Sequence, residues 1–347
     1  MSKPKEVFRL YANCKVTEGA RRSIVCDLWH SRYDFIPNML AYLLKEHDGM
    51  SLEEIKAHYD HEHDDVIEEY YDFLLKNGYG FYTDEPHLFP ALPEGYRHPG
   101  RISNAIIDMD RQSGHDYKSL FGQLEALGCK AVQIRAYDPC PPAEWVRIMD
   151  CLLDTHIQAV EILTPHMDNV PPSEWIKVVN TYPRIGSFAV HGSPEDEVKE
   201  TPGQVPVAFI KQVISDDTHC GLVHPAFFSI NIDGYTESRE ANNCLNGKIS
   251  IDRQGQLCNC PSLPERYGHV SEVSLAEALA MQDFVRYDSI TKDSVSVCSD
   301  CEFRYICSDC RAFTHEKDYG TEAPKKYGKP AKCTYDPYTA TWQSDVS

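Results

Sequence analysis

Two closely spaced pairs of cysteines constrain this chain more than any other feature. The segment from Cys298 to Cys310 places four thiols within thirteen residues, as Cys298-x2-Cys301 and Cys307-x2-Cys310. A Cys-x2-Cys turn brings two sulfurs close enough to share one metal atom or one cluster. A disulfide framework is not expected, because nothing marks the chain as secreted and 347 residues need no stapling. The pattern therefore predicts a metal or iron–sulfur element, with four unligated thiols as the alternative.

The charge balance disfavours several classes of partner. The chain has 53 acidic and 34 basic residues, for a formal net charge of −19. Such a surface repels phosphate backbones and anionic lipid heads, so we expect no nucleic acid and no membrane among its partners. No apolar run approaches the length of a membrane span, and Met1 is followed by charged residues and not by an apolar signal segment. We expect a cytoplasmic protein whose fourteen cysteines stay reduced.

Residues 1–84 have the order of elements of a small winged-helix-like domain. Residues 7–14 and 23–28 alternate β-prone side chains and are expected to form a hairpin, followed by three short helices and a strand. The third helix, from residue 64 to 76, carries five carboxylates and one lysine, which argues against a DNA groove. We instead expect peptide recognition, with a peptide strand added at the sheet edge near residues 22–28.

Capping signals mark several helix boundaries. Ser51 with Glu54 forms a capping box for the second helix, and Gly78 is expected to end the third. The same capping signature recurs at Ser274 and Glu277 and predicts a helix from residue 275 onward. These local patterns predict helix starts independently of the tertiary fold.

The middle of the chain predicts an α/β fold. A proline-rich linker at residues 85–101 precedes residues 102–222, in which strands alternate with helices. Strands are expected at residues 103–109, 131–134, 159–163 and 186–190, with a weaker element at 205–214. This order predicts a parallel sheet with ligand chemistry at the carboxyl ends of its strands. About four to five units indicate an incomplete (β/α) barrel.

Residues 223–347 form the predicted cysteine-rich region. Strands are expected at residues 228–232 and 248–251, separated by Cys244 and followed by Cys258 and Cys260. The spacing Cys244-x10-Gly255-x4-Cys260, then the two pairs, then Cys333, resembles a SPASM domain. This domain is the cluster-binding carboxyl-terminal extension of radical-SAM peptide maturases. Two residues separate Cys307 from the last paired cysteine here, where the usual pattern has three.

The resemblance extends along most of the chain. Together the following motifs resemble the SPASM maturase of bacterial grasp-with-spasm systems: Tyr11-Ala-Asn-Cys, Arg22-Ser-Ile-Val-Cys-Asp-Leu, Ile102-Ser-Asn-Ala-Ile-Ile-Asp, Cys260-Pro-Ser and Cys301-Glu-Phe-Arg-Tyr-Ile-Cys. In those systems the maturase is encoded with an ATP-grasp peptide ligase that modifies a ribosomally made peptide. The resemblance implies a PqqD-like recognition domain, a barrel of radical-SAM type, and a precursor-peptide leader and an ATP-grasp ligase as partners.

The resemblance also implies two [4Fe–4S] clusters and their ligands. For the second cluster the implied ligands are Cys298, Cys301, Cys307 and Cys333. For the first cluster they are Cys244, Cys260 and Cys310, and the fourth position is left to Cys258, Cys220 or an open iron. The remaining cysteines lie in apolar patterns and are expected in the core: Cys14, Cys26, Cys129, Cys140 and Cys151.

One departure from the radical-SAM pattern decides the expected chemistry. Such enzymes carry a Cys-x3-Cys-x2-Cys loop after the first barrel strand, which leaves one iron free to chelate S-adenosylmethionine. Here that loop reads Asp110-Arg-Gln-Ser-Gly-His-Asp, and the motif occurs nowhere else in the chain. We therefore expect no S-adenosylmethionine cofactor and no radical-SAM activity.

Three hypotheses for function follow. The chain could be a maturation protein that binds a precursor peptide and works with the ligase. It could be a peptide-modifying enzyme that uses radical-SAM-type chemistry or the open iron of the first cluster, with catalytic residues that the sequence does not identify. It could also be a zinc-binding interaction protein, because Cys-x2-Cys pairs suit tetrahedral zinc as well.

Overall fold

The computed structural model describes residues 6–202, 205–314 and 327–343. The chain divides into two compact units. Unit 1 contains Met1–Tyr96, Leu222–Asn243 and Ile290–Ser347, and unit 2 contains Arg97–Gly221 and Cys244–Ser289. These units follow contacts and not chain order, so the predicted boundaries at 1–84, 102–222 and 223–347 stay a prediction. No described helix is long and apolar enough to cross a membrane.

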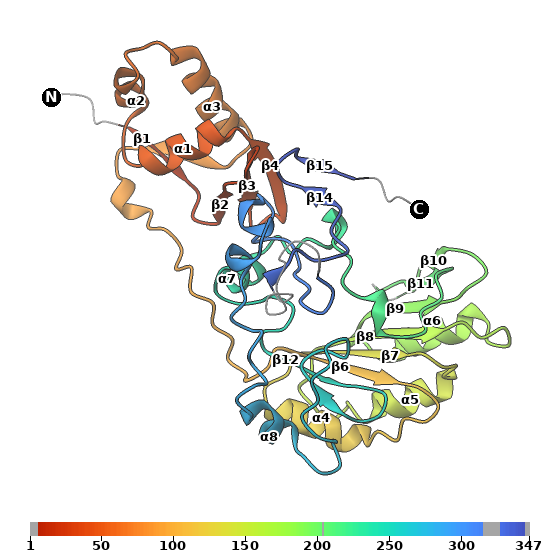
Figure 1. The fold of residues 1–347 in the computed structure, drawn as a ribbon. Helices are drawn as coiled ribbons and strands as arrows, with labels where there is room; N and C mark the ends of the chain where they lie inside the picture. The colour runs from red at the N-terminus through yellow and green to blue at the C-terminus, as the bar shows by residue number, and fades with distance from the viewer. Residues whose placement is uncertain (1–5, 203–204, 315–326, 344–347) are drawn as a thin grey trace. The chain divides into compact units, whose positions relative to one another are not determined.

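The amino-terminal part of unit 1 contains two small sheets (Figure 1). One is the antiparallel sheet of β2 (Cys14–Thr17), β3 (Ser23–Asp27) and β4 (Arg32–Ile36), in that order. The other pairs β1 (Val7–Leu10) with β5 (Gly80–Thr83). The strand predicted over residues 7–14 is therefore wrong, because a turn in which the Cys14 N–H donates to the Tyr11 carbonyl divides it. The predicted sheet edge near residues 22–28 is also wrong, because β3 is the central strand.

Three helices lie between β4 and β5 in the chain: α1 (Asn38–Glu46), α2 (Leu52–His58) and α3 (Asp64–Lys76). The Ser51–Glu54 capping box is confirmed, since the serine hydroxyl accepts from the Glu54 N–H and the glutamate accepts from the Ser51 N–H. The turn after α3 needs Gly78, whose φ of +66° lies in the left-handed region. The apolar faces of the helices join one core with Phe8 and Val25.

The carboxyl-terminal segments of unit 1 have little regular structure. The predicted strand at residues 228–232 is wrong, because helix α7 (Ile232–Glu240) begins at its end. The side chain of Asn231 accepts from the Gly234 N–H and caps this helix, a local signal that outweighs the β-prone residues before it. The other elements are the short turns η3 (Pro225–Phe227), η4 (Lys292–Ser294) and η5 (Cys298–Asp300), and a hairpin of β14 (Tyr335–Asp336) and β15 (Thr341–Trp342).

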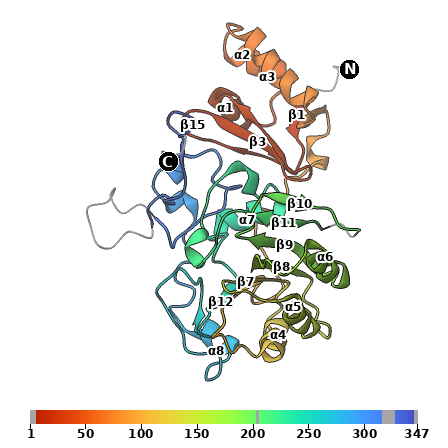
Figure 2. The same ribbon diagram turned by 90° about the vertical axis from the view of Figure 1, so that its right-hand side faces the viewer.

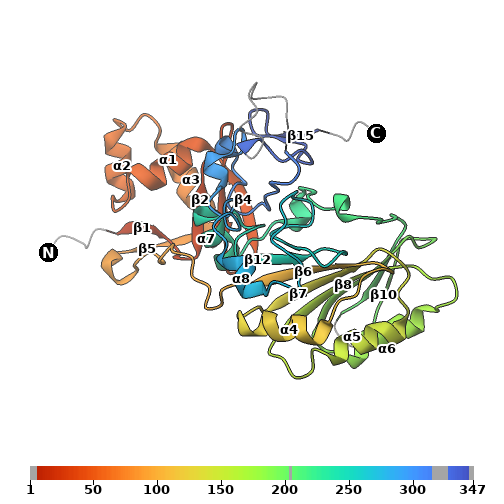
Figure 3. The ribbon, with the colours of Figure 1, turned by 60° about the horizontal axis from the view of Figure 1, so that its bottom comes forward.

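Unit 2 is built on an eight-stranded sheet in the order β10-β11-β9-β8-β7-β6-β12-β13 (Figure 3). Its parallel strands are β6 (Asn104–Met109), β7 (Ala131–Ala136), β8 (Ala159–Pro165), β9 (Ile185–His191), β11 (Val207–Ile210) and β12 (Lys248–Ile251). The edges, β10 (Glu197–Lys199) and β13 (Leu257–Cys258), pair antiparallel. The predicted α/β class and parallel sheet are confirmed, and the two edges show that the sheet is not closed.

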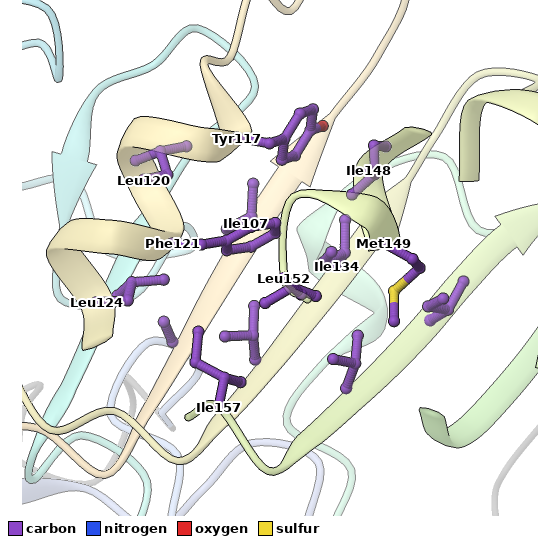
Figure 4. Packing of buried hydrophobic residues seen from close by; sticks show 14 of the residues in the cluster. Ile107, Tyr117, Leu120, Phe121, Leu124, Ile134, Ile148, Met149, Leu152 and Ile157 are labelled. Carbon is purple, nitrogen blue, oxygen red and sulfur yellow. The ribbon is translucent and has the colours of Figure 1, made fainter. Parts of the chain in front are cut away.

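Helices cover one face of this sheet (Figure 2). They are α4 (Tyr117–Ala126), α5 (Pro142–Asp150), α6 (Pro172–Thr181) and α8 (Leu275–Ala280). Alternate strand residues such as Ile107 and Ile134 point into this interface, where they meet Phe121 and Ile148 (Figure 4). The capping box of Ser274 and Glu277 opens α8 as predicted.

The opposite face of the sheet carries polar side chains. At the carboxyl ends of β6 and β7, Asp108 and Arg135 are register partners and both are buried. The Arg135 Nε and Nη2 atoms donate to the two Asp108 carboxylate oxygens at 2.6 and 2.8 Å. Removing one partner of a buried pair is strongly destabilising because the other charge is left without compensation.

We expect Asp108→Ala to destabilise unit 2 by about 3–5 kcal/mol, because Arg135 stays buried without a counter-charge. Urea unfolding followed by circular dichroism measures this as a lower midpoint. Glu144→Ala is the matched control, since it breaks the exposed Arg147–Glu144 pair and should change the midpoint little. Equal midpoints for the two variants would contradict the assignment.

Candidate metal centres

Four predicted ligands belong to unit 1: Cys298, Cys301, Cys307 and Cys333, called here the unit-1 thiols. Burial raises the pKa of Cys298 to about 12, and the thiols of Cys307 and Cys333 add to this shift. Burial also raises the pKa of Cys301, and Cys307 and Cys298 again contribute. These electrostatic effects link Cys298 with Cys307 and Cys333, and Cys301 with Cys307 and Cys298, whereas their convergence on one cluster stays a prediction.

The cysteine loop, residues 298–310, is held against the sheet β2-β3-β4 within unit 1. The ring of Phe303 is buried and meets Tyr33 and Phe35, with centroids 5.6 and 5.9 Å apart. The buried Glu302 carboxylate accepts from Arg22 Nε at 2.9 Å and from the Tyr335 hydroxyl. The loop has almost no secondary structure of its own. Its position therefore depends on these side-chain contacts.

Two backbone features refine the position of the loop. A side chain at Gly19 would come within 2.8 Å of the Glu302 backbone nitrogen, so only glycine allows this approach. The Ala20 N–H donates to the Asp300 carbonyl at 2.7 Å. Val297, directly before the first thiol, has φ of +63°, a conformation that a β-branched residue adopts only when its surroundings impose it.

A second group of thiols belongs to unit 2: Cys220, Cys244 and Cys260, called here the unit-2 thiols. Burial raises the pKa of Cys260 to about 12, with further contributions from Cys244 and Cys220. Both suggested fourth ligands interact electrostatically with Cys260, because the Cys260 thiol also raises the pKa of Cys258, so the choice between them stays open. The thiol of Cys258 is fully buried and donates to the Ser250 carbonyl at 3.6 Å. Cys310, the other predicted ligand of the first cluster, is buried in unit 1.

The donors in these groups are thiols, which are ligands both for iron–sulfur clusters and for zinc. Among the described residues, no group of three or more His, Cys, Asp or Glu side chains is arranged to hold one metal ion. In a [4Fe–4S] cluster each thiolate binds a different iron, so the sulfurs stand farther apart than around one zinc ion. Cluster binding by these thiols therefore stays a prediction.

The remaining cysteines confirm the prediction of a packing role. Cys129 and Cys140 lie in the core of unit 2, and Cys151 packs against it. Cys14 and Cys26 lie in the two cores of unit 1. These side chains behave as small hydrophobic residues.

The loop after β6 lines a cavity of about 430 Å³ at the carboxyl ends of β6 and β7. Its walls include Asp110, Arg111, His115 and Asp138, and Cys140 is the only cysteine among the lining residues. Burial raises the pKa of the Cys140 thiol to about 12. A single protonated thiol provides no three-thiolate site at this position.

Sequence reasoning missed the charged residues around these sites. Arg135 interrupts an apolar strand, and that break in the pattern could have identified its buried pair with Asp108. Lys248 lies four residues after Cys244, and Lys292 lies six residues before Cys298. No spacing rule distinguishes these two lysines from surface lysines, and only their burial and contacts do.

Comparisons with known proteins add little to this geometry. No protein-family model and no curated protein matches the chain. Among solved structures, the chain is similar to Streptococcus suis SuiB in its crystal structure bound to S-adenosylmethionine. The two share 9% sequence identity over 94% of this chain and 100% of the SuiB chain, with a TM-score of 0.38. A likeness this weak carries no argument about this chain, so the two groups of thiols remain the basis for a functional proposal.

Proposed function

We propose that this protein is a maturation factor for a ribosomally made peptide, that it holds two [4Fe–4S] clusters, and that it acts with an ATP-grasp ligase. The observation that supports the proposal is the loop of residues 298–310, which carries Cys298, Cys301 and Cys307 and is held by buried contacts. A loop with only one short turn of regular structure, held in place by buried side chains, is typical of a segment that binds a metal or cluster. The SPASM-like spacing of the same cysteines supports iron–sulfur clusters as those ligands.

The unit-1 thiols supply a complete set of four ligands for the second cluster. For the first cluster the proposed ligands are Cys244, Cys260 and Cys310, and the fourth position is left to Cys258, Cys220 or an open iron. Bound clusters supply one-electron transfer, or an iron that can bind substrate where a thiolate ligand is missing. The enzyme with an open iron in the first cluster is the second candidate function. We do not propose cleavage of S-adenosylmethionine, because the loop after β6 has no cysteine.

The precursor peptide is proposed to bind the amino-terminal part of unit 1. Since β3 is central, the available edges of its sheet are β2 and β4. We favour β4, because Phe35 on that strand and Met39 and Tyr42 on α1 expose large apolar side chains. A peptide strand on β4 would gain backbone hydrogen bonds and place its side chains against this surface.

The cluster assignment predicts selective loss of iron. Cys301→Ala should remove the second cluster and leave about half of the iron and sulfide, because Cys301 belongs to only one ligand set. Anaerobic purification, metal analysis and visible absorbance measure this. Cys244→Ala should remove the first cluster, whereas Cys151→Ala, a packing residue, should retain both.

Two outcomes would contradict the cluster assignment. Loss of both clusters in Cys301→Ala with retention of both in Cys244→Ala would mean that the ligand sets are wrong. Stoichiometric zinc in place of iron in the wild-type protein would favour the zinc-binding alternative.

Peptide recognition predicts an affinity in the micromolar range, roughly 8 kcal/mol, for the leader of a precursor peptide. The full chain is titrated with a labelled leader, since the sheet β2-β3-β4 shares a core with the cysteine loop and is not isolated from it. Tyr42→Ala should weaken binding several-fold by removing apolar contact area. Met281→Ala, at an exposed methionine of unit 2, should not change it. Tight, salt-sensitive binding of duplex DNA with no binding of the leader would refute this prediction.

A further inference from the structure

Each group of thiols has one lysine directed at it. Lys292, in η4, is only 5% exposed, and its Nζ donates to the carbonyl oxygens of Cys307 and Ser308 at 2.6 and 2.8 Å. Lysine is rarely buried to this extent without a negatively charged partner. Both acceptors are neutral carbonyl groups, and the negative groups that act on this ammonium are the Cys307 and Cys298 thiols and the Asp309 carboxylate.

The buried acidic side chains around the unit-1 thiols already have cationic partners. Asp309 accepts from Arg311 Nη2 at 2.5 Å and from the Asn242 amide at 2.6 Å. Glu302 accepts from Arg22. Within residues 6–202, 205–314 and 327–343, no carboxylate lies at ion-pair distance from Lys292. Asp309 also acts electrostatically on Lys292, together with the thiols of Cys307 and Cys298. Because Asp309 already pairs with Arg311 and Glu302 with Arg22, Lys292 adds one excess positive charge beside these thiols.

The unit-2 thiols also have a lysine beside them, Lys248, which is half-buried where Lys292 is buried. Lys248 begins β12, and its Nζ donates to the Cys244 sulfur at 3.7 Å. After Cys244, the thiols of Cys260 and Cys220 are the next groups that raise the pKa of Lys248 by electrostatic interaction. Its neighbour Ile249 points into the helix-covered core, which places Lys248 on the other face of the sheet. The described residues again offer no carboxylate at ion-pair distance.

We propose that Lys248 and Lys292 are positioning residues for charge, each compensating the negative charge of one thiolate-ligated cluster and thereby raising the reduction potential of that cluster. The inference rests on the proposed function, because it needs clusters at both groups of thiols. A cluster with thiolate ligands is anionic and gains one more negative charge when it accepts an electron from an external reductant. A nearby ammonium in a low-dielectric interior stabilises the more negative state more than the less negative one.

A redox titration of the reconstituted full chain tests this proposal. Dithionite is the one-electron donor, and electron paramagnetic resonance follows the reduced clusters. Replacing either lysine by glutamine keeps an N–H donor for the neighbouring acceptors but removes the positive charge. Replacing it by arginine keeps the positive charge. Lys292→Gln should reduce the equilibrium constant for reduction of one cluster by at least tenfold, a shift of about 59 mV for a one-electron couple. Lys248→Gln should do the same to the other cluster, and Lys292→Arg and Lys248→Arg should remain near the wild-type values.

Lys56→Gln is the matched control. Lys56 is also buried, at 9% exposed, but its charge is compensated by Glu68 in the helical part of unit 1. Its replacement should leave both potentials unchanged. If a glutamine variant binds no iron, recovery of iron by the arginine variant supports the charge role, and loss of iron in both variants overturns it in favour of a structural role.

The remaining outcomes separate this inference from the function on which it rests. If both clusters are present and their reduction potentials are unchanged in Lys292→Gln and in Lys248→Gln, the lysine inference is wrong but the proposed function is not affected. A wild-type protein that takes up no iron and sulfide overturns the proposed function and the lysine proposal with it.

Discussion

The packing of Phe303 and Glu302 against the sheet β2-β3-β4 is the interaction on which the candidate centre of unit 1 depends. The cysteine loop has only one short turn of regular structure, η5, so its own backbone hydrogen bonds cannot hold four sulfurs in place. Its shape is instead supported by the Phe303 ring contacts, the ion pair from Arg22, and the backbone approach that Gly19 permits. Residues nearly 300 positions apart in the chain thus form one core. Substitutions in the amino-terminal sheet are therefore expected to affect the thiols even where they touch no ligand.

Unit 2 follows a different principle, because its site residues lie on a regular scaffold. The parallel sheet places Asp108, Arg135 and Lys248 on the face that the helices leave open, while alternate residues fill the core on the other face. Asp108 and Arg135 lie near the carboxyl ends of β6 and β7, whereas Lys248 lies at the amino end of β12. The ion pair of Asp108 and Arg135 then compensates charge inside the unit without using Lys248, which remains directed at Cys244.

Features set by local sequence were predicted well. The capping boxes at Ser51 and Ser274, and the βα alternation after residue 102, depend on neighbouring residues and appear as expected. The errors concern pairing over distance. Residues 7–10 pair with residues 80–83 and not with the nearby hairpin, and residues 248–251 extend the sheet of unit 2 although they follow it by many residues. The charge balance around Lys292 could not be predicted from the sequence either, because it depends on which carboxylates pair with other cations in the folded chain.

Iron and acid-labile sulfide per chain, measured together with the Mössbauer spectrum of the anaerobically purified full-length protein, test the central claim most directly. Two [4Fe–4S] clusters predict about eight irons and eight sulfides per chain, with a spectrum of thiolate-ligated clusters. Mononuclear zinc, or a chain with neither iron nor sulfide after reconstitution, would contradict the account. It would mean that the gathered thiols, their supporting contacts and the two lysines serve a different purpose.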